Sequence, residues 1–411
     1  MQSQKIRSVF TRPLSAVAAG VMLLAGCGGG GSSTVVPPVA AKVSAIKYPK
    51  VYAAGRIAGF GSIVINGVHY DETKANIVDE DGVSHPSSDL KLGMVAEIQA
   101  SDLGTVDNSS TGGSTLTAAT AQSIVIKSAV QGPVESIDSA AGTVTVLGQL
   151  VKVNASTVFD TALVGGLPGI KVGDVVKVYG TALVTGGGYA ATRIEPRPGA
   201  SLYALRGTVT AIDPVAKTVS IGSTTVDVSA ISIPDTVKVG SVVRFKLQTT
   251  KVNGVWVAAE EKSGADQPQD NDHSELEGTI SEYTSAKAFS VDGVPVDASG
   301  VTLPAGTVLA LGARVSVQGA VVKGVLVATT VKLETEQDVQ DEGFDVDGAV
   351  TAIDATKSTL VVHDTTVSFD AKVTVTGGAL ADIKVGSSVE IHGTLATDGT
   401  TVNATAIKLR H

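Results

Sequence analysis

The sequence predicts an all-β fold, a tandem array of about five small five-stranded barrels of the OB-like kind. Two observations predict it. The chain repeats itself about every 70 to 77 residues, and each copy is rich in Val, Ile and Thr with almost no stretch of helical periodicity. A unit of this size with five strands cannot bury both faces of an open sheet, so closure into a barrel is the economical arrangement. A small two-sheet sandwich is the alternative.

A glycine opens the first strand of each copy. The copies QGPVESIDSAAGTVTV, from Gln131, and RGTVTAIDPVAKTVSI, from Arg206, show the pattern. We expect a strand after this glycine, then a turn held by an aspartate whose side chain hydrogen-bonds its own backbone. The leading glycines are Gly55, Gly132, Gly207, Gly278 and Gly348.

A second glycine marks the back half of each copy, as in VGDVVKVYG and VGSSVEIHG. After it, one position is always apolar and the position before that one is always polar, the period-two pattern of a strand with one buried face. The glycines are Gly93, Gly173, Gly240, Gly312 and Gly386, and the apolar residues are Ile98, Val178, Phe245, Val317 and Ile391.

Tight turns place the remaining strands. The second strand ends in a two-residue turn such as Asn66-Gly67 or Asp292-Gly293, a strong hairpin signal. An irregular connection follows the third strand, and a hairpin such as Asn253-Gly254 joins the fourth strand to the fifth. Three hairpin-linked strands, an irregular connection and two more strands are the strand plan of an OB-like barrel.

These landmarks divide the chain into segments. Two acidic stretches, 263–276 and 335–346, are predicted to be linkers whose like charges keep neighbouring barrels apart. The predicted barrels are residues 54–128, 129–198, 203–262, 277–334 and 347–411, after a signal peptide at 1–26 and a lipidated, flexible tether at 27–53.

The only cysteine, Cys27, ends a signal-like segment. Lys5, Arg7 and Arg12 precede an apolar run, residues 14–26, which is too short to span a bilayer comfortably. The run ends in LAGC, which resembles the bacterial lipobox and implies cleavage before Cys27 and acylation of it, for instance with palmitate. Because Gly28 and not Asp follows, the resemblance points to the outer membrane of a Gram-negative bacterium. An ordinary secretory signal is the alternative.

The repeat also resembles a known family. GFGSIVINGVHYDET, which ends at Thr73, together with the later L-x-x-G-M-x-V pattern and a terminal A-x-x-I, is similar to the domain-of-unknown-function family 5666. That family occurs in tandem in exported bacterial proteins, often lipoproteins. The resemblance covers nearly all of residues 54–410 and is clearest in the first copy. It implies no activity and no catalytic residues.

Few residues are candidates for metal binding or catalysis. His363, Asp364 and His392, all in the fifth copy, are candidate ligands of a metal site, and exposed surface histidines are the alternative interpretation. Elsewhere we find no G-x-S-x-G nucleophile motif, no recurring Ser–His–Asp set and no EF-hand spacing. We therefore expect no catalytic residue, no cofactor and no enzyme activity.

The predicted function is binding, adhesion or scaffolding in the cell envelope, because strand positions recur between copies whereas polar residues do not. The net charge of −9 argues against a nucleic-acid partner, and 4% aromatic residues argue against stacking on sugars or bases. We expect two partners: the membrane, through the N-terminal lipid, and a protein or glycan of the envelope or the cell exterior. The protein would face either the periplasm or the cell surface. A periplasmic carrier of divalent metal is the alternative function.

Overall fold

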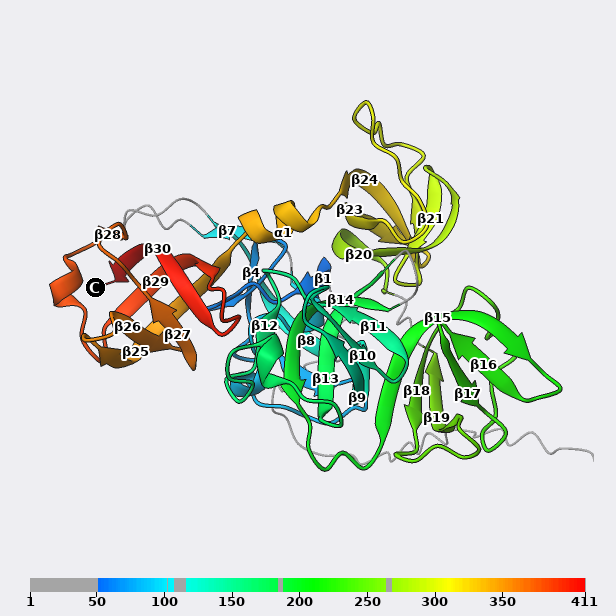
Figure 1. Ribbon diagram of the computed structural model, residues 1–411. Helices are drawn as coiled ribbons and strands as arrows, with labels where there is room; N and C mark the ends of the chain where they lie inside the picture. Colours follow the sequence, from blue (N-terminus) through cyan, green and yellow to red (C-terminus); the bar gives the residue numbers. More distant parts are fainter. Residues whose placement is uncertain (1–50, 102, 107–115, 184–187, 264–267, 411) are drawn as a thin grey trace, which may run out of the picture. The chain divides into compact units, whose positions relative to one another are not determined.

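Five closed barrels account for nearly all the described residues (Figure 1). The structure is a computed structural model that describes residues 51–410 except 102, 107–115, 184–187 and 264–267. All five barrels belong to one unit of the chain, Tyr48–His411.

The third barrel shows the common topology. Its first strand pairs antiparallel with the second and fourth, the second pairs with the third, the third pairs parallel with the fifth, and the fifth pairs antiparallel with the fourth. This closed 1-2-3-5-4 order is the OB plan, so the predicted barrel is confirmed and the sandwich alternative is wrong. Its strands are β15 (Tyr203–Asp213), β16 (Thr218–Ile221), β17 (Thr224–Asp227), β18 (Val242–Leu247) and β19 (Trp256–Ser263).

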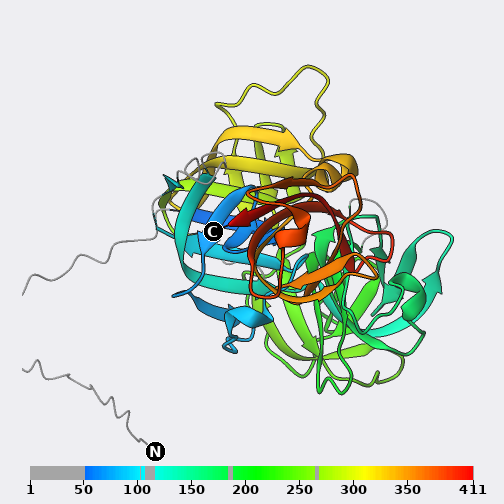
Figure 2. The same cartoon turned by 90° about the vertical axis from the view of Figure 1, so that its left-hand side faces the viewer.

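The other four barrels have the same strand order. The fifth is drawn in orange to red in Figure 2. The first contains β1 (Val51–Arg56), β2 (Gly59–Phe60), β3 (Ile63–Ile65), β4 (Val68–Asp71), β5 (Asn76–Asp79), β6 (Val95–Ala100), β7 (Gly104–Val106) and β8 (Leu116–Lys127). The second contains β9 (Val130–Asp138), β10 (Thr143–Val146), β11 (Gln149–Lys152), β12 (Val158–Phe159), β13 (Val175–Ala182) and β14 (Tyr189–Pro196). The fourth contains β20 (Asn271–Ser285), β21 (Ala288–Val291), β22 (Val294–Asp297), β23 (Arg314–Val322) and β24 (Val325–Leu333). The fifth contains β25 (Phe344–Asp354), β26 (Thr359–Val362), β27 (Thr365–Ser368), β28 (Thr374–Thr376), β29 (Ser388–Leu395) and β30 (Thr401–Arg410).

The leading glycine of each copy lies beneath the hairpin turn between the second and third strands. A Cβ atom on any of the five would lie less than 3 Å from that turn or from the residue just before it. A larger residue at these positions would therefore crowd the hairpin against the first strand. The neighbours of the five glycines, in chain order, are Asn66, Leu147, Ile221, Asp292 and His363.

The second glycine of each copy begins the turn into the fourth strand. All five have a positive φ, between 73° and 94°, which favours glycine. Each N–H donates to the carbonyl of the first strand two residues beyond the leading glycine, as from Gly173 to Val134 at 2.8 Å and from Gly386 to Val350 at 2.8 Å. The two recurring glycines thus fix the first, third and fourth strands to one another.

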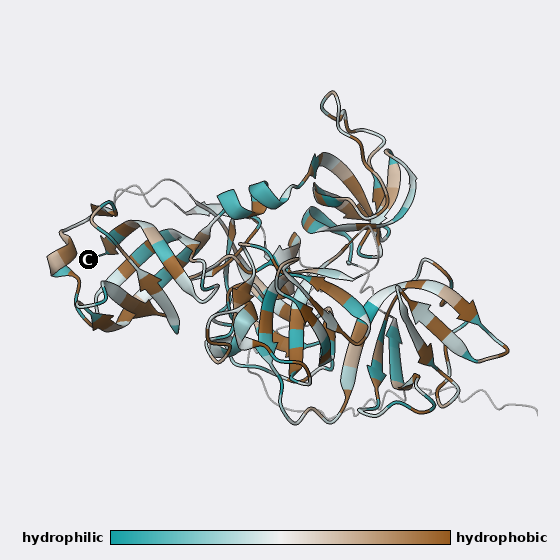
Figure 3. Ribbon diagram, viewed as in Figure 1, coloured by the Kyte–Doolittle hydropathy of each residue, from teal (hydrophilic) through white to brown (hydrophobic). Residues whose placement is uncertain are grey.

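Hydrophobic and hydrophilic residues alternate along many of the strands (Figure 3). The apolar side chains of this alternation form the barrel cores. The five apolar residues of the fourth strand are all fully buried: Ile98, Val178, Phe245, Val317 and Ile391. Their polar neighbours, however, are not fully exposed, and Arg244 is buried. Arg244 is covered because it pairs with Glu80 and Asp81 of the first barrel.

Strand pairing joins the barrels. β1 pairs parallel with β20, β9 pairs antiparallel with β15, and β2 pairs parallel with β25. The sheets therefore connect the first, fourth and fifth barrels in one group and the second and third in another.

Three segments differ from the sequence prediction. Residues 51–53, assigned to the tether, are buried in β1. Residues 271–276, assigned to an acidic linker, lie in β20, where pairing with β1 and β23 supplies the hydrogen bonds of the strand. In the second predicted linker, Thr335 caps the short helix α1 (Glu336–Asp341) with a capping box to Asp338. The structure describes no helix long and apolar enough to cross a membrane.

Candidate functional site

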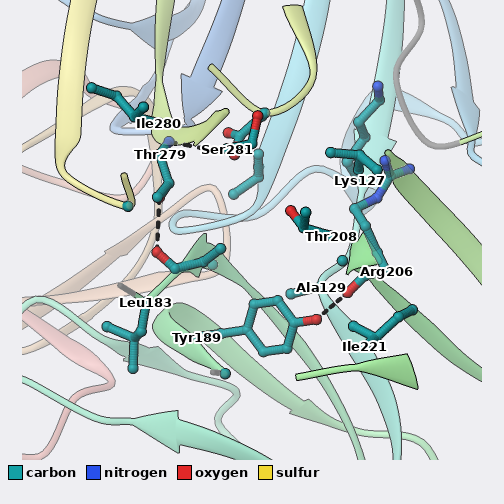
Figure 4. Close-up of a pocket in the computed structure, with 18 of the residues that line it drawn as sticks. Lys127, Ala129, Leu183, Tyr189, Arg206, Thr208, Ile221, Thr279, Ile280 and Ser281 are labelled. Carbon is teal, nitrogen blue, oxygen red and sulfur yellow. Dashed lines mark hydrogen bonds between the residues drawn. The ribbon is translucent and has the colours of Figure 1, made fainter. Parts of the chain in front are cut away.

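A cavity of about 610 Å³ lies between the first four barrels (Figure 4). Each of these barrels contributes residues: β1, β6 and β8 from the first, β13 and β14 from the second, β15 and the β16–β17 turn from the third, and β20 and the β21–β22 turn from the fourth. The cavity thus depends on contacts between copies.

The cavity wall is mostly apolar. Leu183, Val242 and Leu311 line it with half-buried or exposed side chains. Other apolar lining residues, such as Leu276 and Ile280, are buried in the barrel cores, so part of the wall is the outer boundary of those cores.

Hydrogen bonds between barrels fix the polar part of the wall. The Gln149 amide donates to the Ile221 carbonyl at 2.8 Å, and the Thr279 hydroxyl donates to the Ala182 carbonyl at 2.8 Å. The Tyr189 hydroxyl donates to the Arg206 carbonyl (Figure 4). These bonds connect the second barrel to the third and the fourth around the cavity.

Most of the charged side chains that line the cavity are in ion pairs. Lys127 pairs with Glu97, Arg206 pairs with Glu80, and Glu277 pairs with Arg314. Each pair is largely shielded from solvent, so these charges are held in place and neutralised locally.

Asp292 is the exception among the charged residues of the wall. Its side chain is accessible from the cavity, and its carboxylate accepts a hydrogen bond from the Thr279 N–H at 3.4 Å. Within the described part of the chain it has no ion pair. Desolvation by the surrounding protein raises the pKa of Asp292 to about 6, although Arg206 and Lys127 act in the opposite direction.

An acidic turn after β5 docks the first barrel onto the third. Glu80 is 6% exposed and pairs with Arg206 and Arg244, and Asp81 pairs with Arg244 and Lys246. Burial alone would raise the pKa of Glu80, but the two arginines lower it below its usual value. This charged contact lies beside the cavity, because Arg206 belongs to both.

The three predicted metal ligands have separate partners. The His363 ring stacks on Phe60 with centroids 5.5 Å apart, Asp364 pairs with Lys91 at 3.1 Å, and His392 Nδ1 lies 2.8 Å from Asp345 Oδ1. The hydrogen bond to Asp345 raises the pKa of His392. In the described ranges, no three His, Cys, Asp or Glu side chains are grouped to hold a metal ion.

Other predicted features lie outside the described residues. They are Cys27, the signal peptide at 1–26 and most of the tether. The loop 101–115 is described only in part. The aspartate turns are confirmed: Asp138, Asp213 and Asp354 each accept hydrogen bonds from the backbone N–H groups two and three residues further along the chain.

The sequence analysis did not single out the residues that form the cavity. Asp292 appeared only as a hairpin signal, and Lys127 and Arg206 did not appear as candidates. One signal was available in the sequence. The turns that join the second and third strands carry different residues in the five copies, so a functional side chain in one turn has no counterpart in the others.

Comparison with known families identifies the repeated unit. Residues 131–195, 277–332 and 347–408 match the family described as Domain of unknown function (DUF5666). Three of the barrels are DUF5666 domains. These are the second, fourth and fifth barrels, whereas the resemblance noted in the sequence was drawn mainly from the first. The first and third barrels share the strand order of the three DUF5666 domains. A search of curated proteins gives no match to the chain.

Proposed function

We propose that this chain is a non-enzymatic, lipid-anchored protein of the bacterial envelope that binds a small molecule between its barrels. The cavity is the observation that carries the proposal. Its volume of about 610 Å³ falls in the range of small-molecule sites, roughly 300–1,000 Å³. Its mostly apolar wall with a few fixed polar groups is also typical of such sites.

The polar groups at the cavity favour binding of a small molecule over metal transport, because most of them already have partners in the protein. The charged pairs at the cavity are already matched, and its Gln, Thr and Tyr side chains donate to main-chain carbonyls of neighbouring barrels. These groups serve to shape the site. A metal carrier is not favoured, because His363, Asp364 and His392 each have a separate partner.

The proposed anchor is Cys27, supported by the lipobox-like LAGC sequence behind a basic head and an apolar run. Acyl chains contribute roughly 0.8 kcal/mol per buried CH₂, so two or three chains hold a protein firmly on a membrane. We expect cells fed radiolabelled palmitate to label the wild-type chain and not a Cys27→Ser variant. Labelling of both, or of neither, would contradict the anchor. Protease treatment of intact cells then tells which side of the outer membrane the barrels occupy.

A substitution that places a large side chain in the cavity tests the proposed binding site. Thr210 is exposed and lines the cavity, and its hydroxyl donates to the Ser220 carbonyl. Thr351 occupies the same position in the fifth barrel and makes the same bond, to Val361, away from the cavity. We expect the neutral dye N-phenyl-1-naphthylamine to bind the wild type and Thr351→Trp, and to bind Thr210→Trp at least tenfold more weakly. Equal binding by the two variants would place the dye elsewhere and refute the proposed site.

A further inference from the structure

We infer that the ligand of this cavity is an apolar amine whose ammonium group is bound by Asp292. The inference rests on the proposed function and specifies the ligand class for the same site. It follows from the charge balance of the wall, from the way the hairpin presents the carboxylate, and from the apolar surroundings.

The charged residues that line the cavity carry a net negative charge. Three are acidic and two are basic: Glu97, Glu277, Asp292, Lys127 and Arg206. Lys127 pairs with Glu97, Arg206 with Glu80 and Glu277 with Arg314, whereas Asp292 has no ion pair among the described residues. The net charge of the wall therefore favours a cation over an anion.

The hairpin presents the Asp292 carboxylate to the cavity. Asp292 has φ of +46° at the first position of the β21–β22 turn, and the turn rests on Gly278, which has no side chain to displace it. A carboxylate has about four acceptor sites, and here the Thr279 N–H is a long donor at 3.4 Å. Acceptor sites therefore remain for the N–H donors of an ammonium group.

The neighbours of this carboxylate favour an apolar body on the ligand. Leu311 of the fourth barrel, Leu183 of the second and Val242 of the third line the cavity with exposed or half-buried side chains. An alkyl or aryl chain would be removed from water against these side chains, at about 25 cal/mol per Å² of apolar surface.

The test compares three eight-carbon probes that differ only in the head group. Calorimetry of the purified chain at pH 7.5 should show octylammonium binding at least tenfold more tightly than octan-1-ol, with octanoate the weakest. Lowering the pH from 7.5 to 5 crosses the pKa of Asp292 and protonates it, so octylammonium binding should weaken several-fold while octan-1-ol binding stays constant.

Asp292→Asn removes the charge and keeps the turn, since Asn66 already occupies the same turn position in the first barrel with φ of +53°. We expect it to weaken octylammonium binding at least tenfold and leave octan-1-ol unchanged. The matched control is Asp364→Asn, a turn aspartate of the fifth barrel with φ of +59° and a side chain 81% exposed, which should alter neither.

The outcomes separate the two claims. If octan-1-ol or octanoate binds as tightly as octylammonium, or if Asp292→Asn has no effect on octylammonium, the amine inference is overturned and the binding cavity stands. If none of the three probes binds and the neutral naphthylamine dye does not bind either, both the inference and the proposed function are overturned.

Discussion

Gly207 illustrates, at the scale of one residue, why the five copies open with glycine. A Cβ on Gly207 would meet the Cγ2 of Ile221 at 2.6 Å and the hydroxyl of Tyr189 at 3.1 Å. Ile221 is 2% exposed and belongs to the core shared by the second and third barrels, so it has little room to move. The recurrence of this glycine could be read from the sequence, but its reason required the position of the hairpin.

A Gly207→Ala variant should therefore be destabilised. The added methyl group overpacks the contact with Ile221, which costs about 1–3 kcal/mol. The single tryptophan, Trp256, reports on this barrel because it is buried in the same core and packs edge-to-face against Tyr203. Urea unfolding followed by Trp256 fluorescence measures the change. Val215→Ala, in the same barrel at a side chain 92% exposed, is the control and should change the free energy of unfolding by less than about 0.5 kcal/mol. Equal stability of both variants would contradict the packing argument.

Asp292 shows the limit of prediction for a single residue. The Asp-Gly pair predicted a hairpin, and the structure has that hairpin between β21 and β22. Its neighbours in the cavity, however, come from β8 and β15, far away in the sequence. The chemistry of this side chain could not be predicted, because no local pattern encodes which barrels surround it.

At the scale of strands and turns, the sequence was most informative where the determining contacts are local. Period-two alternation and two-residue turns depend on neighbours within a few positions, and the five predicted core positions of the fourth strand are all buried. Trp256, which follows the Asn253-Gly254 hairpin, packs in a barrel core.

Elements that depend on a second barrel were not predicted. The acidic residues 271–276 were assigned to a linker because like charges on a short segment usually remain solvated. In the structure they extend β20, which pairs with β1, and His273 lies 3.3 Å from Glu275 within the strand. The small helix α1 had a readable signal, the T-x-x-D capping box from Thr335 to Asp338, but its six residues are too few to show a helical period.

At the scale of the whole described chain, the residues that vary between copies mark the contacts between barrels. The position before the leading glycine is one example. Gln131 donates to the carbonyl of Leu202, Arg206 pairs with Glu80, and Glu277 lines the shared cavity. The residues that recur in every copy are enough to form the barrel. The polar residues that differ between copies can therefore determine which barrels contact one another.

The Glu80 contact tests whether the first and third barrels unfold together. A Glu80→Gln variant leaves Arg206 and Arg244 without their buried carboxylate, and breaking a buried pair in this way costs about 3–5 kcal/mol. We expect the free energy of unfolding reported by Trp256, in the third barrel, to fall by about 3 kcal/mol although the substitution is in the first barrel.

The effect of Glu80 should depend on pH. Because the pKa of Glu80 is lowered in the folded chain, its contribution to stability is present above its usual pKa of 4.5 and is lost as the pH falls through the folded-state pKa. The difference between variant and wild type should therefore shrink in acid.

Glu336→Gln is the matched control for this experiment. Glu336 pairs with Lys152, but both side chains are about half exposed, at 53% and 42%, so removing the pair should cost less than about 1 kcal/mol. If Glu80→Gln shifts the Trp256 transition no more than Glu336→Gln does, the third barrel unfolds independently of the first. The cavity would then lack the rigid frame that selective binding of a small molecule requires. A large shift confined to Glu80→Gln would mean instead that the charged contact holds the two barrels in the arrangement that forms the cavity.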